Sequence, residues 1–118
     1  MKPDPSRLRA LEVAESLRGM GAIEVKRFFG GSSLLADGVQ FAFVMKGTLY
    51  LRTDDNTRAA FVAKGAAPFS YAKSAARVQV TSYYEAPADV LDDPAALLRW
   101  SIEAHAVALR SGRSSRPR

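Results

Sequence analysis

Residues 34–52 read LLADGVQFAFVMKGTLYLR, and this stretch decides the fold. Asp37-Gly38 separates two apolar segments, and Lys46-Gly47 ends the second of them. Both dipeptides are typical of tight hairpin turns, whose central residues take positive φ, a conformation that glycine adopts without strain. The stretch therefore predicts three consecutive antiparallel strands.

The middle strand of this group differs from the strand that follows it. In residues 48–52, Leu49 and Leu51 share one face and Tyr50 points to the other, because side chains alternate along a strand. Residues 39–45 are apolar on both faces. That pattern is typical of a central strand that is covered on each side.

Helices are predicted at both ends of the chain, over residues 5–18 and from Asp93-Pro94 to about residue 109. Proline at the first helical position opens each of them. The positions expected to face inward are Leu8, Leu11, Ala14 (or Glu15) and Leu17 in the first helix, and Leu97, Leu98, Ile102, His105 (or Ala106) and Leu109 in the last. Both helices then need a sheet to pack against.

The remaining segments complete an α+β fold. Short apolar groups from Ile23 onward and the alternating residues 77–85 predict further strands, while residues 56–64 predict a short helix closed by Gly65. Residues 66–69, which contain a proline, are expected to form a loop. The sequence predicts an antiparallel meander of four or five strands with both terminal helices on one face and a short inserted helix.

The formal charge of +5 comes from 17 basic and 12 acidic residues and is concentrated at the C-terminus. Residues 110–118 carry four arginines and no acid, which leaves residues 1–109 at +1. We expect residues 1–109 to be the domain and residues 110–118 a disordered tail, since the tail has no apolar residue with which to dock. Its arginines are candidate nonspecific nucleic-acid contacts or simply a solubilising end: Arg110, Arg113, Arg116 and Arg118.

Composition excludes several chemistries. The chain has no cysteine and one histidine, so disulfides, thiolate zinc sites and multi-histidine metal centres within one chain are excluded. Its apolar runs are far shorter than the ~20 residues that span a bilayer, which predicts no membrane segment and a cytoplasmic protein. No cofactor is expected.

Three features are weighed as catalytic or ligand sites, and each has a simpler interpretation. The run of two glycines and two serines over residues 30–33 lacks the lysine of a phosphate loop and precedes a strand, which favours a turn or bulge. His105 borders the apolar side of the last helix without a partner for base chemistry. The carboxylate pairs Asp54-Asp55 and Asp92-Asp93 precede helices and are expected to cap them rather than bind metal. The chain is therefore expected not to be an enzyme.

Aromatic residues are abundant in the strands, and most are assigned to the core. Tyr71, Tyr83 and Tyr84 are the exceptions, because phenol groups on a sheet surface or strand end often serve recognition. We take them as a candidate partner surface.

Six motifs occur in order along the chain: RFFGG (27–31), ADGVQFA (36–42), GTLYLR (47–52), PFSY (68–71), SYY (82–84) and DP (93–94). Together they resemble the N-terminal domain of the TfoX (Sxy) competence regulators, over about residues 7–109. The resemblance marks seven positions as fold determinants first and contact residues second: Phe29, Gly30, Gly31, Gly38, Tyr50, Tyr83 and Tyr84.

This resemblance implies a compact α/β domain and, in the best-known members, regulation of DNA-uptake genes alongside the cyclic-AMP receptor protein. Those members carry a second, C-terminal helical domain, so the resemblance implies a stand-alone N-terminal domain here. Our leading hypothesis is a non-enzymatic domain of bacterial transcriptional regulation that binds a protein of the transcription machinery.

Other functional hypotheses stay open. The first alternative is an accessory protein that binds nucleic acid through the basic tail. A small-molecule enzyme or sensor, with a pocket between helices and sheet, is the third. An exposed edge strand would support a homodimer.

Overall fold

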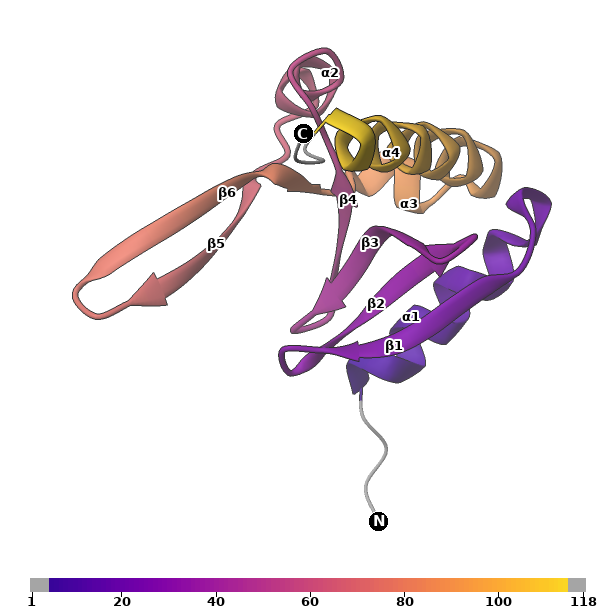
Figure 1. Ribbon diagram of the computed structural model, residues 1–118, viewed down its shortest axis with the longest axis horizontal. Helices are drawn as coiled ribbons and strands as arrows, with labels where there is room; N and C mark the ends of the chain where they lie inside the picture. The colour runs from indigo at the N-terminus through magenta and orange to yellow at the C-terminus, as the bar shows by residue number, and fades with distance from the viewer. Residues whose placement is uncertain (1–4, 115–118) are drawn as a thin grey trace.

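The computed structural model describes residues 5–114 and confirms the α+β class (Figure 1). Helices and strands alternate in the order α, four strands, α, two strands, then two helices. The elements are α1 (Pro5–Ser16), the 3-10 turn η1 (Arg18–Met20), β1 (Ile23–Phe28), β2 (Gly31–Ala36), β3 (Val39–Met45), β4 (Thr48–Arg52), α2 (Arg58–Ala63), β5 (Pro68–Lys73), β6 (Ala76–Glu85), α3 (Ala88–Leu91) and α4 (Pro94–Ser114).

The six strands form one antiparallel sheet in the order β1-β2-β3-β4-β6-β5. Three two-residue turns connect β1 to β4, and both central residues of each turn have positive φ. The turns are Phe29-Gly30, Asp37-Gly38 and Lys46-Gly47. Positive φ at both positions is the mark of the type I′ turn, which suits the right-handed twist of paired strands. The two hairpins expected from residues 34–52 are thereby confirmed.

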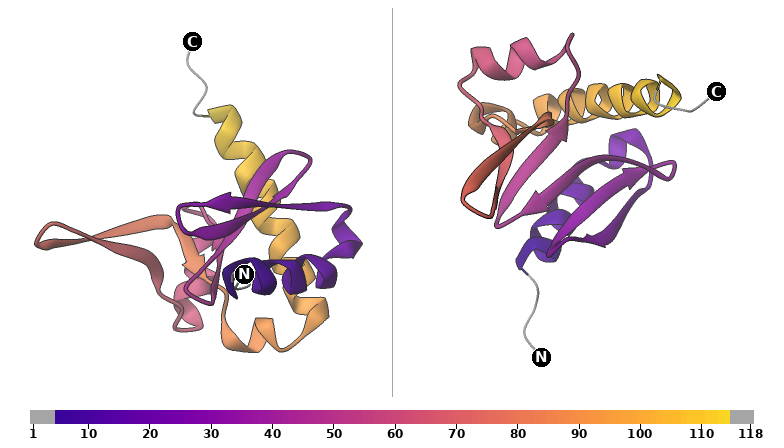
Figure 2. Two further views of the ribbon diagram at one scale, coloured as in Figure 1. Left: turned by 90° about the horizontal axis from the view of Figure 1, so that it is seen from below. Right: turned by 60° about the vertical axis from the view of Figure 1, so that its left-hand side comes forward.

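The prediction of a loop over residues 66–69 is wrong for Pro68 and Phe69, because β5 begins at Pro68. Proline is compatible with this position, since the first residue of an edge strand needs no donor for the ladder. Strand β6 then pairs with both β5 and β4, so the last two strands depart from a simple meander. Figure 2 shows the β5–β6 hairpin extending from the body as a two-stranded arm.

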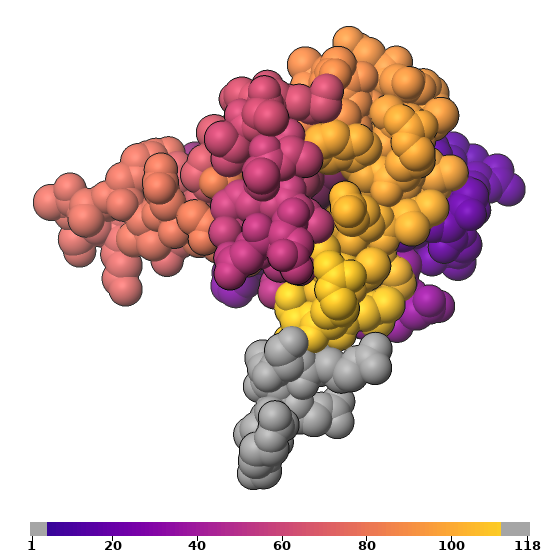
Figure 3. Space-filling view, turned by 90° about the horizontal axis from the view of Figure 1, so that it is seen from above, coloured from indigo at the N-terminus to yellow at the C-terminus, as the bar shows by residue number. Residues whose placement is uncertain are grey.

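Helices α1 and α4 cover one face of the sheet, as predicted. Their buried residues share a single hydrophobic core with Leu34, Leu49 and Leu51 of the strands. Figure 3 shows α3 and α4 beside the α2 segment, with the hairpin arm projecting away from these helices. The opposite face of the sheet is therefore left to the aromatic side chains of the strands.

The predicted inward positions of both terminal helices are partly wrong. Leu8 and Leu11 of α1 are exposed, as are Ile102 and Leu109 of α4. The buried positions are mostly small: Ser6, Ala10 and Val13 in α1, with Leu17 directly after it, and Ala96, Leu97, Ser101, Ala104, Val107 and Ala108 in α4. Small side chains on the contact stripe let a helix lie close to the sheet, so the largest apolar residues do not mark the buried side.

A β-bulge at Phe41 sets which side chains of β3 face the helices. Leu34 of β2 lies opposite Ala42, whereas Leu35 lies opposite Gln40, so Phe41 is an extra residue. A bulge of this kind reverses the alternation of side chains beyond it.

The bulge explains why residues 39–45 are apolar on both faces. Phe41, Ala42 and Val44 all belong to the core under the helices, while Phe43 packs on the other face against Tyr50. One strand thus contributes a large side chain to each side of the sheet.

Helix α4 continues through Ser114, which corrects the predicted start of a disordered tail at residue 110. Arg110 lies in this helix and donates a hydrogen bond from Nη2 to Oδ2 of Asp54 at 3.0 Å, which holds the helix end against the β4–α2 connection. Arg113 also lies in the helix, but its side chain, like Arg116 and Arg118, lies outside the described residues. Within residues 5–114, no helix is long and apolar enough to cross a bilayer.

Candidate functional site

An aromatic layer covers the face of the sheet opposite the helices. The Phe43 ring lies at its centre, with four rings at centroid distances of 4.8–5.1 Å. These rings belong to Phe28, Tyr50, Phe69 and Tyr83, which come from β1, β4, β5 and β6. The sheet curls enough to bring rings from both edge strands, β1 and β5, onto the same central side chain.

A groove of about 530 Å³ opens beside this layer, between the meander and the β5–β6 hairpin. Its lining is apolar and mostly aromatic: Phe28, Phe29, Phe43, Met45, Phe69, Tyr71, Val80 and Tyr83. Its volume lies in the usual range of binding pockets. The arm supplies one wall and the turn after β1 supplies part of the other, so the groove exists only because these distant segments meet.

Phe29 is the most unusual residue of this groove. Its side chain is 87% exposed, and its φ of 45° lies in the left-handed region. It occupies the first central position of a type I′ turn, where Asn, Asp or Gly is favoured, and such strain costs about 1–3 kcal/mol. The two-residue turn accounts for the positive φ, and the ring packs edge-on against Phe28 at a centroid distance of 4.9 Å, but this contact leaves most of the ring exposed. Both features are expected where a side chain serves recognition.

The three tyrosines predicted as a partner surface are separated by the structure. Tyr71 is 42% exposed and Tyr83 is only 9% exposed, and both line the groove. Tyr84 is 6% exposed on the other face, where its ring lies 5.9 Å from that of Phe61 in the core. Including Tyr84 in the surface was therefore wrong, because adjacent residues of a strand point to opposite faces.

Tyr83 forms a fixed floor for the groove. Its hydroxyl accepts a hydrogen bond from Nε2 of Gln40 at 3.2 Å, and the Arg52 guanidinium carbon lies 5.6 Å from the ring centroid. The Nε atom of Arg52 is buried and has no hydrogen-bond partner among the described residues. The stacked cation thus makes its contact to the ring face rather than to an acceptor.

Tyr50 of the aromatic layer has a raised pKa. Burial raises the pKa of Tyr50 above its ordinary value of 10.0, and the nearby Glu85 carboxylate raises it further. Arg77 and a hydrogen bond with Thr48 oppose these effects without cancelling them. Tyr50 therefore contributes a neutral ring near pH 7.

His105 and Gly31 have structural positions. Nε2 of His105 lies 2.8 Å from the Ala36 carbonyl oxygen, and its ring packs edge-on against Phe41, so it borders the packing face as predicted. A Cβ on Gly31 would lie 2.3 Å from the Val44 carbonyl oxygen. This close approach of two strands explains the second glycine of the predicted turn region.

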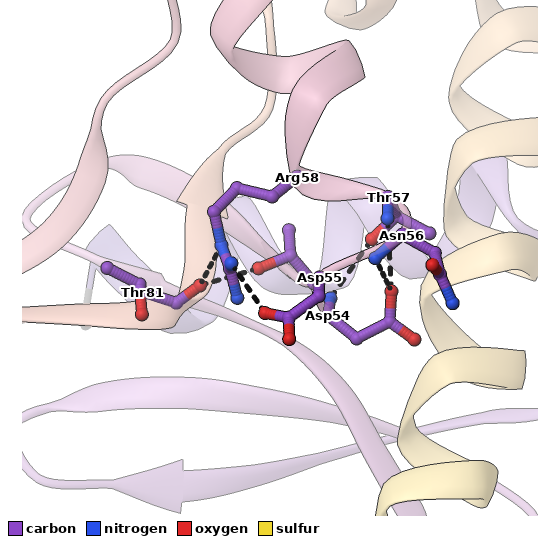
Figure 4. A network of polar contacts seen from close by, with 7 residues as sticks. Asp54, Asp55, Asn56, Thr57, Arg58 and Thr81 are labelled. Atoms are coloured by element: carbon purple, nitrogen blue, oxygen red, sulfur yellow. Dashed lines mark hydrogen bonds and ion pairs between the residues drawn. The ribbon is translucent and has the colours of Figure 1, made fainter.

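The prediction that Asp54 or Asp55 caps the short helix is wrong in position, because α2 has Thr57 at its N-cap without a side-chain hydrogen bond and Asp54 instead closes the turn before the helix (Figure 4). Oδ1 of Asp54 accepts hydrogen bonds from the backbone N–H groups of Asn56 and Thr57, both at 3.0 Å. Arg58 donates to Asp55 Oδ1 at 2.8 Å and to the carbonyl oxygen of Thr81 at 3.1 Å, which ties the connection to β6.

Hydrogen-bond donors around Asp54 stabilise the ionised form of its carboxyl group. Partial burial opposes its ionisation, but hydrogen bonds from Arg110, Thr57 and Asn56 outweigh burial and lower its pKa below 3.8. Oδ1 of Asp93 accepts a hydrogen bond from the Ala95 N–H at the start of α4, at 3.1 Å. Within residues 5–114, no three metal-ligating side chains come together.

Most of the residues that line the groove were not predicted from the sequence, because the phenylalanines were expected to lie in the core. Phe28, Phe43 and Phe69 do pack together, but they do so on the face without helices. The available signal was Phe29, a large apolar residue directly before Gly30 in a two-residue turn.

The model of the TfoX N-terminal domain family matches residues 15–108. The chain belongs to this family. The match runs from the last residues of α1 into α4 and includes all six strands, so every groove residue of this TfoX N-terminal domain lies inside it. No curated protein matches the chain.

Proposed function

We propose that this TfoX N-terminal domain is a non-enzymatic protein-interaction module whose partner binds in the aromatic groove. The observation that carries the proposal is Phe29, which is held at a strained backbone position with 87% of its side chain exposed at the groove. An exposed apolar side chain that becomes buried on binding typically contributes a large share of the energy of a protein interface. The apolar lining favours an interface over catalysis, since Tyr50 is neutral and the capped carboxylates lie elsewhere.

We further propose that the partner belongs to the bacterial transcription machinery and that the domain acts in the cytoplasm. Membership of the TfoX N-terminal domain family supports this assignment, and competence genes are the first regulatory targets to examine. The groove supplies the physical means, because it allows the domain to act as an adaptor without contacting DNA itself.

Photocrosslinking in the native cell tests the proposal. Phe29 is replaced by p-benzoylphenylalanine, which keeps an aromatic side chain at the groove, and Ile102 is replaced in a control because it is exposed on α4. We expect irradiation to give a defined adduct with a transcription protein from position 29 only. Equal adducts from both positions, or none from position 29, would contradict a partner at the groove.

A second candidate function is nucleic-acid binding through the C-terminal arginines, which the sequence favours because four arginines and no acid occur in the last nine residues. Arg110 already pairs with Asp54, so the proposal depends on Arg113, Arg116 and Arg118. Fluorescence anisotropy of duplex DNA, with the full chain and with these three arginines changed to serine, is expected to show binding that weakens steeply with salt and is lost in the variant. Equal binding by both proteins excludes this mechanism.

A further inference from the structure

We infer that the groove recognises an acidic peptide segment, in which one or two large apolar side chains are flanked by carboxylates. This inference rests on the proposed function and adds the chemistry of the partner. It follows from the positions of the basic side chains, several of which lie close to the groove.

The net charge of the described chain is confined to the sheet. Residues 23–52 and 68–85, which form the six strands and their turns, carry six basic and three acidic side chains. The helical segments, residues 5–22, 53–67 and 86–114, carry eight of each sign. The basic groups of the sheet are Lys26, Arg27, Lys46, Arg52, Lys73 and Arg77. The strands and their turns thus carry the net positive charge, while the helical segments are balanced.

Ion pairing follows the same division. Among the described side chains, five of the six ion pairs join groups within the helical segments. The sixth joins Lys26 to Glu24 on β1 at 3.7 Å, between two half-exposed side chains. The excess positive charge of the sheet is therefore not neutralised by the acids of the domain and remains available to an anionic partner.

Lysines lie on three sides of the groove. On β5, Lys73 shares a face with Phe69 and Tyr71, because residues two apart on a strand point the same way. On β1, Lys26 has the same relation to Phe28, and Lys46 directly follows Met45 in the β3–β4 turn. Lys26, Lys46 and Lys73 are all exposed. An apolar side chain in the groove would place its flanking residues beside these ammonium groups.

The same observations disfavour two other occupants. A second copy placed groove to groove would bring Lys26, Lys46 and Lys73 of each copy close to those of the other, which is unfavourable. Nucleobases stacked in the groove would bury polar edges against an apolar lining, and the Tyr83 hydroxyl is already bonded to Gln40. A peptide with an apolar side chain for the lining and carboxylates on either side of it, close to the lysines, fits both features.

Peptide selection tests the inference without knowledge of the natural partner. A random library of twelve-residue peptides on phage is selected against the full chain and counter-selected against Phe29→Asn, which keeps a residue suited to the turn. Selected peptides are then measured by fluorescence anisotropy. We expect the Phe29-dependent peptides to be acidic, with Leu, Phe or Trp at the centre, and to bind more weakly as salt rises.

Charge reversal identifies the lysines involved. Lys46→Glu with Lys73→Glu is expected to weaken binding of the selected peptides about tenfold, whereas Arg7→Glu with Arg99→Glu, on exposed positions of α1 and α4, is expected to change it less than about twofold. Phe29-dependent peptides that are neutral or basic would overturn the inference and leave the groove as an interface. No Phe29-dependent peptide, or displacement of bound peptide by single-stranded oligothymidine, would overturn the proposed function as well.

Discussion

On the helix side of the sheet, Leu49 and Leu51 lie beneath two helices whose contact stripes consist mainly of alanine, serine and valine. On the opposite side, Phe43 and Tyr50 are covered only by other strand residues and by the arm of β5 and β6. The first surface closes because small side chains let rigid helices approach the sheet. The second leaves a groove, because a two-stranded arm covers less of the sheet than a helix and large rings cannot fill every gap.

The two faces of one sheet can thus serve different purposes, with stability on the helix side and, as we propose, recognition on the aromatic side. Leucines and alanines on the helix side contribute mainly through burial, which has no direction and needs no partner molecule. On the aromatic side, Phe29 has a positive φ and a mostly exposed ring, so we expect it to add little to the stability of the isolated domain. Substitutions on the two sides should therefore differ in kind as well as in size.

The largest effect is expected from Leu51→Ala on the helix side. Leu51 is fully buried in the core, so its truncation should lower the free energy of unfolding by about 2–5 kcal/mol in urea denaturation. Leu109→Ala, on the exposed side of α4, is the matched control and should cost less than about 1 kcal/mol. Similar losses for both variants would show that the helix side is not the main source of stability.

The turn between β2 and β3 allows the cost of backbone strain to be measured separately from the cost of lost packing. Gly38→Val should lower the free energy of unfolding by about 1–3 kcal/mol, because φ of Gly38 is 76° and a β-branched residue is strained there. A Cβ at this position meets no atom within 4 Å, so the cost comes from the backbone alone. Thermal denaturation measures it, and an unchanged melting temperature would contradict the assigned turn.

The capped connection between β4 and α2 predicts a smaller, pH-dependent effect. Since the pKa of Asp54 is lowered in the folded domain, its interactions stabilise the fold fully above its ordinary value of 3.8 and are lost as pH falls through the lowered value. Asp54→Asn should lower the free energy of unfolding at pH 7 by about 0.5 kcal/mol, because the pair with Arg110 is half exposed. It should also flatten the decline of stability below pH 4. An unchanged acid limb would show that Asp54 is not involved.

The smallest effect on stability is expected at the groove. Phe29→Asn places a favoured residue at positive φ and removes an exposed ring. The free energy of unfolding should therefore stay constant or rise by up to about 1 kcal/mol, and the melting temperature should follow it. The same variant should lose the crosslinked partner. A clear drop in melting temperature would mean that Phe29 is a fold determinant, as the family resemblance first suggested, and would remove the contrast between the two faces.

Local signals in the sequence were sufficient for the hairpin turns, the Asp93 cap of α4 and the α+β class. Asp37-Gly38 and Lys46-Gly47 act within a few residues, because φ preferences depend on the residue itself. The capping carboxylate of Asp93 acts over two residues in the same way. The buried sides of α1 and α4 were less accessible, because Leu8 and Ala10 compete for the core and only the closeness of the sheet favours the smaller one.

Sequence alone determined that residues 34–52 form antiparallel hairpins, that helices lie at both ends, and that the chain has the motifs of the TfoX N-terminal domain, since each of these depends on neighbouring residues. Tertiary structure decided that Phe43 lies on the groove face while Phe41 and Ala42 lie in the core, and that Phe29 and Tyr71 line one groove. The first fact depends on a one-residue bulge at Phe41, and the second on the path of the β5–β6 arm. Neither is encoded in a local pattern, because both result from how distant strands twist and pack against one another.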